Sequence, residues 1–329
     1  MINRRHLSLF AIGSTLGAPT LARAQTSWDM PTPYTDGTFH TQNIRWFIEE
    51  IAKGTGNDVK IQVHSNNSLI RLPEILRAVS SGQVAAGEIF LSQFGNEDPL
   101  FEVDAIPFLT ADVGQAKALY LSSKTAVEEA LRRRGIRLLY SVAWPSQAFF
   151  SKTPITSAAD MRGMKFRTQS PMTSRMAELL GAIPTSVQGS EIPQAFATNI
   201  VTGMVTSSPT GVQSRAWEFS SHVVDLKAFM PKNAVIVNER AWQRLSVSAR
   251  EVITAKAAAA ELRGWEMSLK SEVDSFAELR RNGMTIVDPP PALQADTRGV
   301  GTKIAEEWSV RAGTAGQAVI AAFRARPSL

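Results

Sequence analysis

Strand-like and helix-like stretches alternate along the chain from about residue 25 onward. Residues 59–63 (Val-Lys-Ile-Gln-Val) alternate apolar and polar side chains, which is typical of a half-buried strand. Residues 37–53, which precede them, carry apolar side chains at helical spacing. Pro73, which follows them, suits the first turn of a helix that runs to about Ser81. This alternation predicts an α/β fold built from layers of helices on sheets.

The same pattern continues through the rest of the chain. We predict further strands at 27–32, 84–91, 136–143, 148–151, 164–168, 183–187, 203–207, 223–224 and 234–237. We predict further helices at 112–134, 172–180 and 192–198. No stretch has the composition of a linker between domains, so two lobes joined by several crossing strands fit better than two separate domains.

One predicted helix is unusually long. Ser248-Ala249-Arg250-Glu251 has the sequence of a capping box and predicts the start of the helix. Asn282-Gly283 suits its C-terminal cap, which gives a length of roughly 50 Å. Such a helix either crosses more than one lobe or is an ordinary core helix that Gly264 weakens mildly, and the sequence leaves both readings open.

The first 24 residues have the composition of a signal peptide. Arg4 and Arg5 precede an apolar stretch at 7–21, and Ala22-Arg23-Ala24 predicts cleavage after Ala24. The apolar stretch is short for a membrane span and rich in small and hydroxyl residues, although a retained anchor is the alternative. The paired arginines fit either the general secretory or the twin-arginine route. We therefore expect a mature periplasmic protein that does not itself span the membrane.

Composition excludes several classes of function. The chain has no cysteine, so it can hold no disulfide, thiolate nucleophile or zinc-thiolate site. Its formal charge of +5 includes three arginines within the first 24 residues, which contain no acidic residue, so the remainder carries +2. That near balance argues against nucleic acid as the partner.

Catalytic motifs are also missing from the sequence. No Gly-x-Ser-x-Gly, Ser-x-x-Lys or phosphate-loop motif occurs, and Gly54-Thr55-Gly56 lacks the third glycine of a dinucleotide fingerprint. No two histidines have the spacing of metal ligands on one helix. We therefore predict no catalytic residue, no metal and no bound cofactor.

Arg167 is the candidate site residue that the sequence itself suggests. It lies near the end of the predicted strand 164–168, just before the Ser170-Pro171 turn into a helix. Open α/β sheets place ligand-binding loops at such positions. A planar guanidinium matches both oxygens of a carboxylate, whereas the alternative is a surface arginine in a salt bridge.

Several segments, taken in order, resemble the substrate-binding proteins of tripartite ATP-independent periplasmic (TRAP) transporters. They are residues 49–56, 106–109, 155 with 160–167, 180–184, 191–203 and 242–245. The resemblance implies two α/β lobes with a cleft, a hinge and a long helix spanning both lobes. It assigns 25–145 with about 233–273 to lobe I, and 146–232 with about 274–329 to lobe II. It also implies a small-molecule solute and integral-membrane TRAP permease subunits as partners.

The resemblance also assigns Arg167 to the carboxylate of the solute. Many relatives carry a second arginine where this chain has Gln147, which can form hydrogen bonds but brings no charge. Where relatives commonly have an Asp-Gly pair and a polar contact residue, this chain offers the hydroxyls of Ser207 and Ser208. One cation instead of two favours a monocarboxylate over a heavily charged acid.

Four further residues complete the candidate site, which are Tyr34, Glu88, Trp144 and Gln169. A buried Glu88 needs a hydrogen-bond donor, either in the protein or on the solute. Trp144 could stack on an apolar or cationic ligand or belong to the core. Glu88 and Trp144 together could instead hold a small amine or a neutral polar solute. An extracytoplasmic sensor subunit or enzyme on the same lobes is a further alternative.

Overall fold

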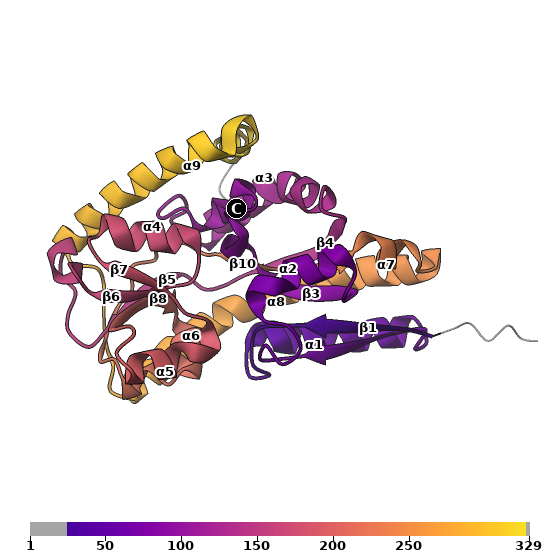
Figure 1. Ribbon diagram of the computed structural model, residues 1–329, viewed down its shortest axis with the longest axis horizontal. Coiled ribbons are helices and arrows are strands. Elements are labelled where there is room, and N and C mark those ends of the chain that lie inside the picture. Colours follow the sequence, from indigo (N-terminus) through magenta and orange to yellow (C-terminus); the bar gives the residue numbers. More distant parts are fainter. Residues whose placement is uncertain (1–24, 327–329) are drawn as a thin grey trace, which may run out of the picture.

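Two groups of β-strands form the centres of two α/β lobes in a computed structural model that describes residues 25–326 (Figure 1). The predicted signal peptide lies outside the described residues. The two-lobe α/β fold predicted from the sequence is confirmed.

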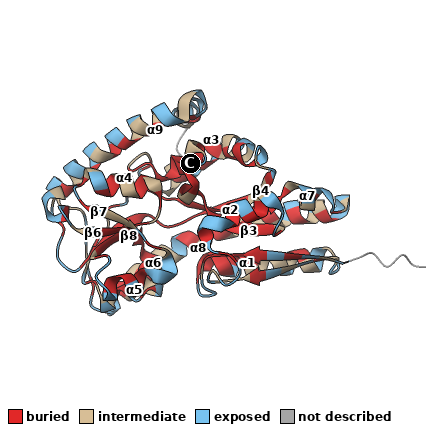
Figure 2. Ribbon diagram, in the orientation of Figure 1, coloured by how far each residue is buried: buried red, intermediate tan, exposed pale blue. Residues whose placement is uncertain are grey.

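Lobe I contains a parallel pair of strands beside a three-stranded antiparallel sheet. Its strands are β1 (Thr26–Pro31), β2 (Val59–His64), β3 (Ala86–Phe90), β4 (Ile136–Ala143) and β10 (Lys232–Asn238). The sheet has the order β3-β10-β4, and β1 packs against β3. Its helices are α1 (Phe39–Gly54), α2 (Leu72–Ser81), α3 (Val113–Arg132) and α7 (Glu239–Gln243), with 3₁₀ turns η1 (Leu91–Phe94) and η2 (Pro99–Ala105). Strands β3 and β10 are buried throughout (Figure 2).

Lobe II is built on a six-stranded mixed sheet of order β11-β9-β5-β8-β6-β7. Its strands are β5 (Gln147–Ser151), β6 (Lys165–Thr168), β7 (Ile183–Ser186), β8 (Gly203–Ser207), β9 (His222–Val224) and β11 (Thr285–Val287). Its helices are α4 (Pro171–Leu179), α5 (Ile192–Ala197) and α6 (Ser208–Gln213), with 3₁₀ turns η3 (Ala158–Met161), η4 (Gly189–Glu191) and η5 (Ala216–Glu218).

The chain crosses between the lobes at the β4–β5 and β9–β10 connections, which run side by side. The Trp144 amide donates to the Pro231 carbonyl at 2.8 Å, and the Gln147 amide donates to the Phe229 carbonyl at 3.1 Å. This pairing holds Trp144 and Gln147 at the junction of the two lobes.

Helix α8 (Val247–Arg281) extends across both lobes, as the sequence allowed (Figure 1). It packs on α1 and β4 in lobe I and on α6 in lobe II. Its predicted end is confirmed, because Asn282 caps it and Gly283 follows in the left-handed region. Its predicted start was wrong by two residues. Ser246, not Ser248, is the N-cap, since its Oγ accepts from the Ala249 amide at 3.1 Å while Ser248 lies within the first turn.

A second long helix, α9 (Pro291–Ala325), was not predicted. It contacts η2 and α3 beside lobe I, and α4 and η3 beside lobe II (Figure 1). The helix is broken at Gly313, whose φ of 57° and ψ of −146° are not helical. The residue ranges predicted for the two lobes remain a prediction.

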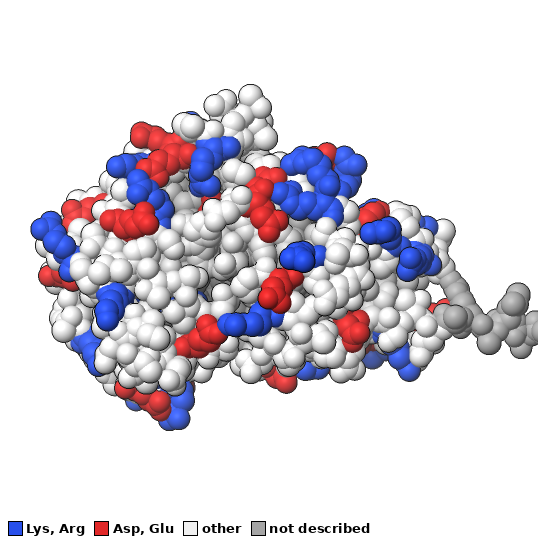
Figure 3. Space-filling model, viewed as in Figure 1, with Lys and Arg blue, Asp and Glu red and all other residues white. Residues whose placement is uncertain are grey.

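The surface carries charges of both signs. On the face shown in Figure 3, Lys and Arg alternate with Asp and Glu rather than forming a patch of one sign. Across residues 25–326, no helix combines the length and the apolar character needed to cross a membrane.

Candidate solute site between the lobes

A cavity of about 290 Å³ lies between the lobes, and both lobes contribute to its wall. Six of the eight residues proposed from the sequence line it: Tyr34, Trp144, Gln147, Arg167, Gln169 and Ser207. Glu88 and Ser208 lie outside this lining. The fold therefore brings together candidate residues that are up to 173 positions apart in the sequence, from Tyr34 to Ser207.

Arg167 projects from β6, and its side chain is held by backbone carbonyls. Nε donates to the Val187 carbonyl at 2.9 Å, and Nη1 donates to the Val205 carbonyl at 3.1 Å. Burial lowers the pKa of Arg167 to about 10, so the guanidinium remains protonated at neutral pH. Within residues 25–326, Nη2 donates no hydrogen bond and no carboxylate pairs with this buried cation. Its Nη2 protons are therefore available to a ligand.

Two glutamine side chains extend this arrangement. Arg167 Nη1 also donates to Gln169 Oε1 at 3.0 Å, and Gln169 Nε2 donates to Gln147 Oε1 at 2.9 Å. Gln147 Nε2 in turn donates to the Pro145 carbonyl at 2.9 Å. Because each amide is oriented by the next, this series of hydrogen bonds fixes the guanidinium, and none of the described residues accepts a hydrogen bond from its Nη2.

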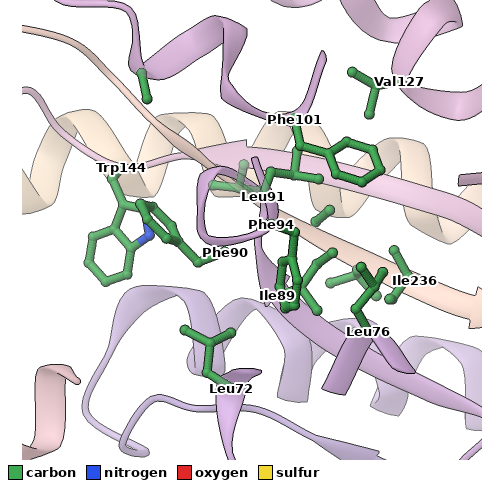
Figure 4. Packing of buried hydrophobic residues seen from close by; sticks show 14 of the residues in the cluster. Leu72, Leu76, Ile89, Phe90, Leu91, Phe94, Phe101, Val127, Trp144 and Ile236 are labelled. Carbon is green, nitrogen blue, oxygen red and sulfur yellow. The ribbon is translucent and has the colours of Figure 1, made fainter. Parts of the chain in front are cut away.

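Tyr34 and Trp144 form the lobe I side of the cavity. Their rings meet edge to face with centroids 5.0 Å apart. Asn233 lies behind them, and its Oδ1 accepts from Tyr34 Oη at 3.1 Å and from Trp144 Nε1 at 2.9 Å. Trp144 also stands beside Phe90, with Leu72 nearby, and these three side chains give the cavity an apolar side (Figure 4).

Glu88 sits behind this wall and finds its donors in the protein. Asn233 Nδ2 donates to Glu88 Oε1 at 2.7 Å, and Thr32 Oγ1 donates to the other oxygen. Burial raises the pKa of Glu88 to about 7, and these two hydrogen bonds limit the rise. His40 Nδ1 lies 3.6 Å from Glu88 Oε1, and burial lowers the pKa of His40 well below its usual range. His40 is therefore neutral and leaves Glu88 without a cationic partner.

Ser207 and Ser208 have different surroundings although they are adjacent. Ser207 caps α6, its Oγ lying 3.0 Å from Thr210 Oγ1, and both residues line the cavity. Ser208 is fully buried, and no partner of its Oγ is found among the described residues. Of the two hydroxyls predicted to contact the solute, only that of Ser207 belongs to a residue that lines the cavity.

The lobes also touch each other around the cavity. Thr38 Oγ1 donates to Gln213 Oε1 at 3.1 Å, and Arg71 pairs with Glu191. Each contact joins a lobe I residue to a lobe II residue, and both partners of the ion pair are exposed. The cavity is therefore partly enclosed by direct contacts between the lobes.

Comparison with known proteins identifies the class. The family model of bacterial extracellular solute-binding proteins, family 7, matches residues 33–309. The chain belongs to this family. It is a solute-binding receptor of the TRAP type, and the resemblance stated from the sequence is confirmed.

Three relatives illustrate the range of this family. A Bordetella pertussis extracytoplasmic solute receptor binding pyroglutamic acid, DctP7, is 39% identical, with a TM-score of 0.90 over 91% of this chain and 99% of that one. A marine metagenome TRAP solute-binding protein specific for pyroglutamate is 32% identical, with a TM-score of 0.90 over 92% and 99%. The C4-dicarboxylate-binding periplasmic protein DctP of Rhodobacter capsulatus is 30% identical over 62% of each chain.

The receptor's cavity contains polar residues that the sequence analysis missed. They are Thr35, Asn66, Asn67, Gln93, Gln188, Ser190, Thr210, Gln213 and Ser214. Asn66 and Asn67 follow β2 and have φ of 56° and 57°, a conformation that asparagine tolerates better than most residues. The Asn66-Asn67 pair, which follows the predicted strand 59–63 after two residues, was thus an available signal.

Proposed function

We propose that this receptor binds a small monocarboxylate, holds its carboxylate on Arg167, and delivers it in the periplasm to the membrane permease of a TRAP transporter. The observation that carries the proposal is the charge of the cavity wall. Arg167 is the one charged side chain among the described residues that line it. Its free Nη2 protons can donate to a carboxylate, and such charge-assisted bonds are roughly twice as strong as neutral ones.

The same wall argues against other ligand classes. A dicarboxylate would bury its second charge without a cation, which is costly. An amine would find no acidic side chain in the lining, because Glu88 lies behind Tyr34 and Trp144. The volume suits a molecule of on the order of ten non-hydrogen atoms, since one water takes up about 30 Å³ of liquid. Pyroglutamate, which the two relatives above bind, is the first compound to test.

Delivery to the permease would use closure of the lobes. A solute that contacts both lobes favours the closed form by the difference between its contacts in the two forms. Thr38 and Gln213 meet across the cleft, as do Arg71 and Glu191, and contacts of this kind would hold the lobes together around a bound solute. The permease would recognise the surface that closure creates. Export through the signal peptide of residues 1–24 places the receptor where this exchange occurs.

Calorimetric titration of the ligand-free mature protein, from Gln25 onward, tests the proposal. L-Pyroglutamate should bind, whereas 2-pyrrolidinone, which lacks the carboxylate, and succinate should bind at least 100-fold more weakly. Arg167→Gln should weaken pyroglutamate binding by at least 100-fold while the protein remains folded. Lys165→Gln is the matched control, because Lys165 lies on the same strand but is exposed and outside the cavity. Equal affinity in Arg167→Gln and the wild type would refute the carboxylate site.

A further inference from the structure

In the hydrogen bonds behind Tyr34 and Trp144, the chemistry of the groups decides which atom donates and which accepts. An indole nitrogen can only donate, so the Asn233 atom that faces Trp144 Nε1 must be the carbonyl Oδ1. The amide Nδ2 then points to Glu88 Oε1, which accepts at 2.7 Å. Thr32 Oγ1 contacts the other oxygen of Glu88, Oε2, and its hydroxyl can either donate to a carboxylate or accept from a protonated carboxyl group. When Glu88 is protonated its proton can therefore lie on Oε2, and Oε1 remains an acceptor in either protonation state.

This orientation determines what Tyr34 can offer to a ligand. Asn233 Oδ1 carries no proton, so Tyr34 Oη must donate its proton to it over 3.1 Å. Burial raises the pKa of Tyr34, so the phenol keeps that proton at neutral pH. With the proton committed to Asn233, the phenol oxygen can interact with a ligand only as an acceptor.

Tyr34 shares a small cavity with the carboxylate site. It belongs to the lobe I wall and Arg167 to the lobe II wall of the same cavity, whose volume is only about 290 Å³. Trp144 presents its ring to the cavity while its N–H is turned to Asn233. A carboxylate held by Arg167 therefore has, in its neighbourhood, an acceptor oxygen and an apolar ring.

We propose that the receptor selects monocarboxylates that carry an N–H or O–H donor near the carboxylate, and that Tyr34 accepts a hydrogen bond from this donor. Asn233 and Glu88 are positioning residues, which never touch the solute but keep the phenol proton directed away from it. The inference rests on the proposed function and deepens it, since it defines which monocarboxylates fit. A ring N–H or a 2-hydroxyl group meets the requirement, and a ring ether oxygen or an ester oxygen does not.

Two ligands of the same shape test the donor requirement. L-Pyroglutamate and 5-oxotetrahydrofuran-2-carboxylate differ in one ring position, where the first has N–H and the second has oxygen. The wild type should bind the first at least 10-fold more tightly. The ring oxygen of the second would set its lone pair against a lone pair of Tyr34 Oη, which would then accept no hydrogen bond from the ligand. Tyr34→Phe should remove this preference by weakening only pyroglutamate. Equal affinity of both ligands for the wild type, with Arg167 still required, overturns the inference and leaves the proposed function intact.

The positioning role needs a readout that loss of stability alone does not change. The dissociation constant of 5-oxotetrahydrofuran-2-carboxylate divided by that of L-pyroglutamate provides this readout, and we call it the selectivity ratio. Glu88→Gln can present either an acceptor or a donor to Asn233, and it should lower the ratio at least 3-fold. Asn233→Leu should bring the ratio to about one, so that the two ligands bind equally well. Glu261→Gln is the matched control, since Glu261 also receives a tyrosine hydroxyl, that of Tyr120, but neither residue lines the cavity. Melting curves identify unfolded variants.

The outcomes are separable. An unchanged ratio in folded Glu88→Gln and Asn233→Leu overturns the positioning role. An unchanged ratio in Tyr34→Phe overturns the acceptor assignment. Failure of the wild type to bind either acid overturns the inference together with the pyroglutamate-like ligand class of the proposed function.

Discussion

Arg167 Nη1 donates to Gln169 Oε1 over 3.0 Å, and no carboxylate lies in that position. A glutamine satisfies part of the guanidinium without neutralising its charge. The cation is therefore positioned in advance but still needs an anion, which is the arrangement expected of a carboxylate receptor. The same geometry shows how the site could be disabled without removing the arginine.

We predict that Gln169→Glu weakens pyroglutamate binding by at least 100-fold. The new carboxylate would form an internal ion pair with Arg167 and repel the carboxylate of the ligand. Calorimetric titration measures the affinity, and the melting temperature of the ligand-free variant should be unchanged or higher. Gln83→Glu, an exposed substitution outside the cavity, is the control and should bind normally. Normal binding by Gln169→Glu would show that Arg167 does not hold the carboxylate.

The ion pair between Arg71 and Glu191 should slow solute release. It joins the lobes beside the cavity but is exposed, so we expect it to contribute only about 0.5–1 kcal/mol. Arg71→Glu alone should raise the dissociation rate of pyroglutamate two- to fivefold in stopped-flow experiments at low salt. The exchanged pair Arg71→Glu with Glu191→Arg should restore most of the wild-type rate.

Two checks isolate this effect. Asp274→Asn, which breaks an exposed pair with Lys270 on α8 at 2.6 Å, should leave the rate unchanged. High salt should reduce the difference between the wild type and Arg71→Glu. A rate increase that the exchanged pair does not reverse would assign the effect to packing rather than to the ion pair.

Glu88 should make the stability of the receptor depend on pH. Its pKa is raised to about 7 in the fold, so the folded state binds the proton more tightly than the unfolded chain. This contribution is fully present below the usual glutamate pKa of about 4.3 and is lost as the pH rises through 7. It amounts to at most about 4 kcal/mol, since the pKa rises by nearly three units and one pKa unit corresponds to about 1.4 kcal/mol.

Urea denaturation at pH 5, 6, 7 and 8 measures this dependence. The free energy of unfolding should fall more steeply with pH in the wild type than in Glu88→Gln. His40 also interacts with Glu88 and stays neutral in the fold, whereas the unfolded chain protonates it below about pH 6.5, so His40 lowers the stability of both proteins at pH 5 and 6 and cancels in the comparison. Burial keeps the pKa of Tyr140 well above its usual range, so Tyr140 does not titrate between pH 5 and 8. Parallel pH profiles for the two proteins would show that Glu88 does not titrate in this range.

Much of the fold could be predicted because its signals are local. Strand β2 shows the alternation of a half-buried strand, and Gly283 follows the end of α8 in a left-handed conformation that glycine adopts easily. Helix α9 was missed because its buried positions include Thr297 and Gly301, which carry little apolar signal. Gly301 packs so closely against Pro107 that a Cβ there would lie 2.7 Å from the Pro107 carbonyl oxygen, so this contact requires glycine rather than an apolar side chain.

The site could be predicted only in part. Arg167 was found from its place at a strand end and from the resemblance to the family, and its role toward the solute stays a proposal. The need of Glu88 for a donor followed from the cost of burying a charge. One of its two donors, Asn233, is 145 positions away and could not be identified, because strand β10 joins β3 through pairing that one sequence does not reveal.

Gly264 illustrates how a structural role can look like a weakness. In the sequence it is a poor helix former inside α8, but a Cβ there would lie 2.3 Å from Val142 Cγ2 and 2.8 Å from Asn43 Nδ2. The glycine lets α8 approach β4 and α1 closely, and Asn43 Nδ2 donates to the Ala260 carbonyl of α8 at 2.8 Å. We therefore predict that Gly264→Ala destabilises the receptor by about 1–3 kcal/mol through overpacking.

Thermal and urea unfolding of Gly264→Ala, Gly299→Ala, Val142→Ala and the double variant Val142→Ala with Gly264→Ala test this prediction. Gly299→Ala is the control, since Gly299 lies in α9 with no atom within 4 Å of a Cβ, and it should stabilise by about 0.5–1 kcal/mol. Val142→Ala combined with Gly264→Ala should be less destabilised than the sum of the single changes, because the first removes the atoms that the second would meet. If Gly264→Ala were as stable as Gly299→Ala, helix propensity and not the close approach would govern this position.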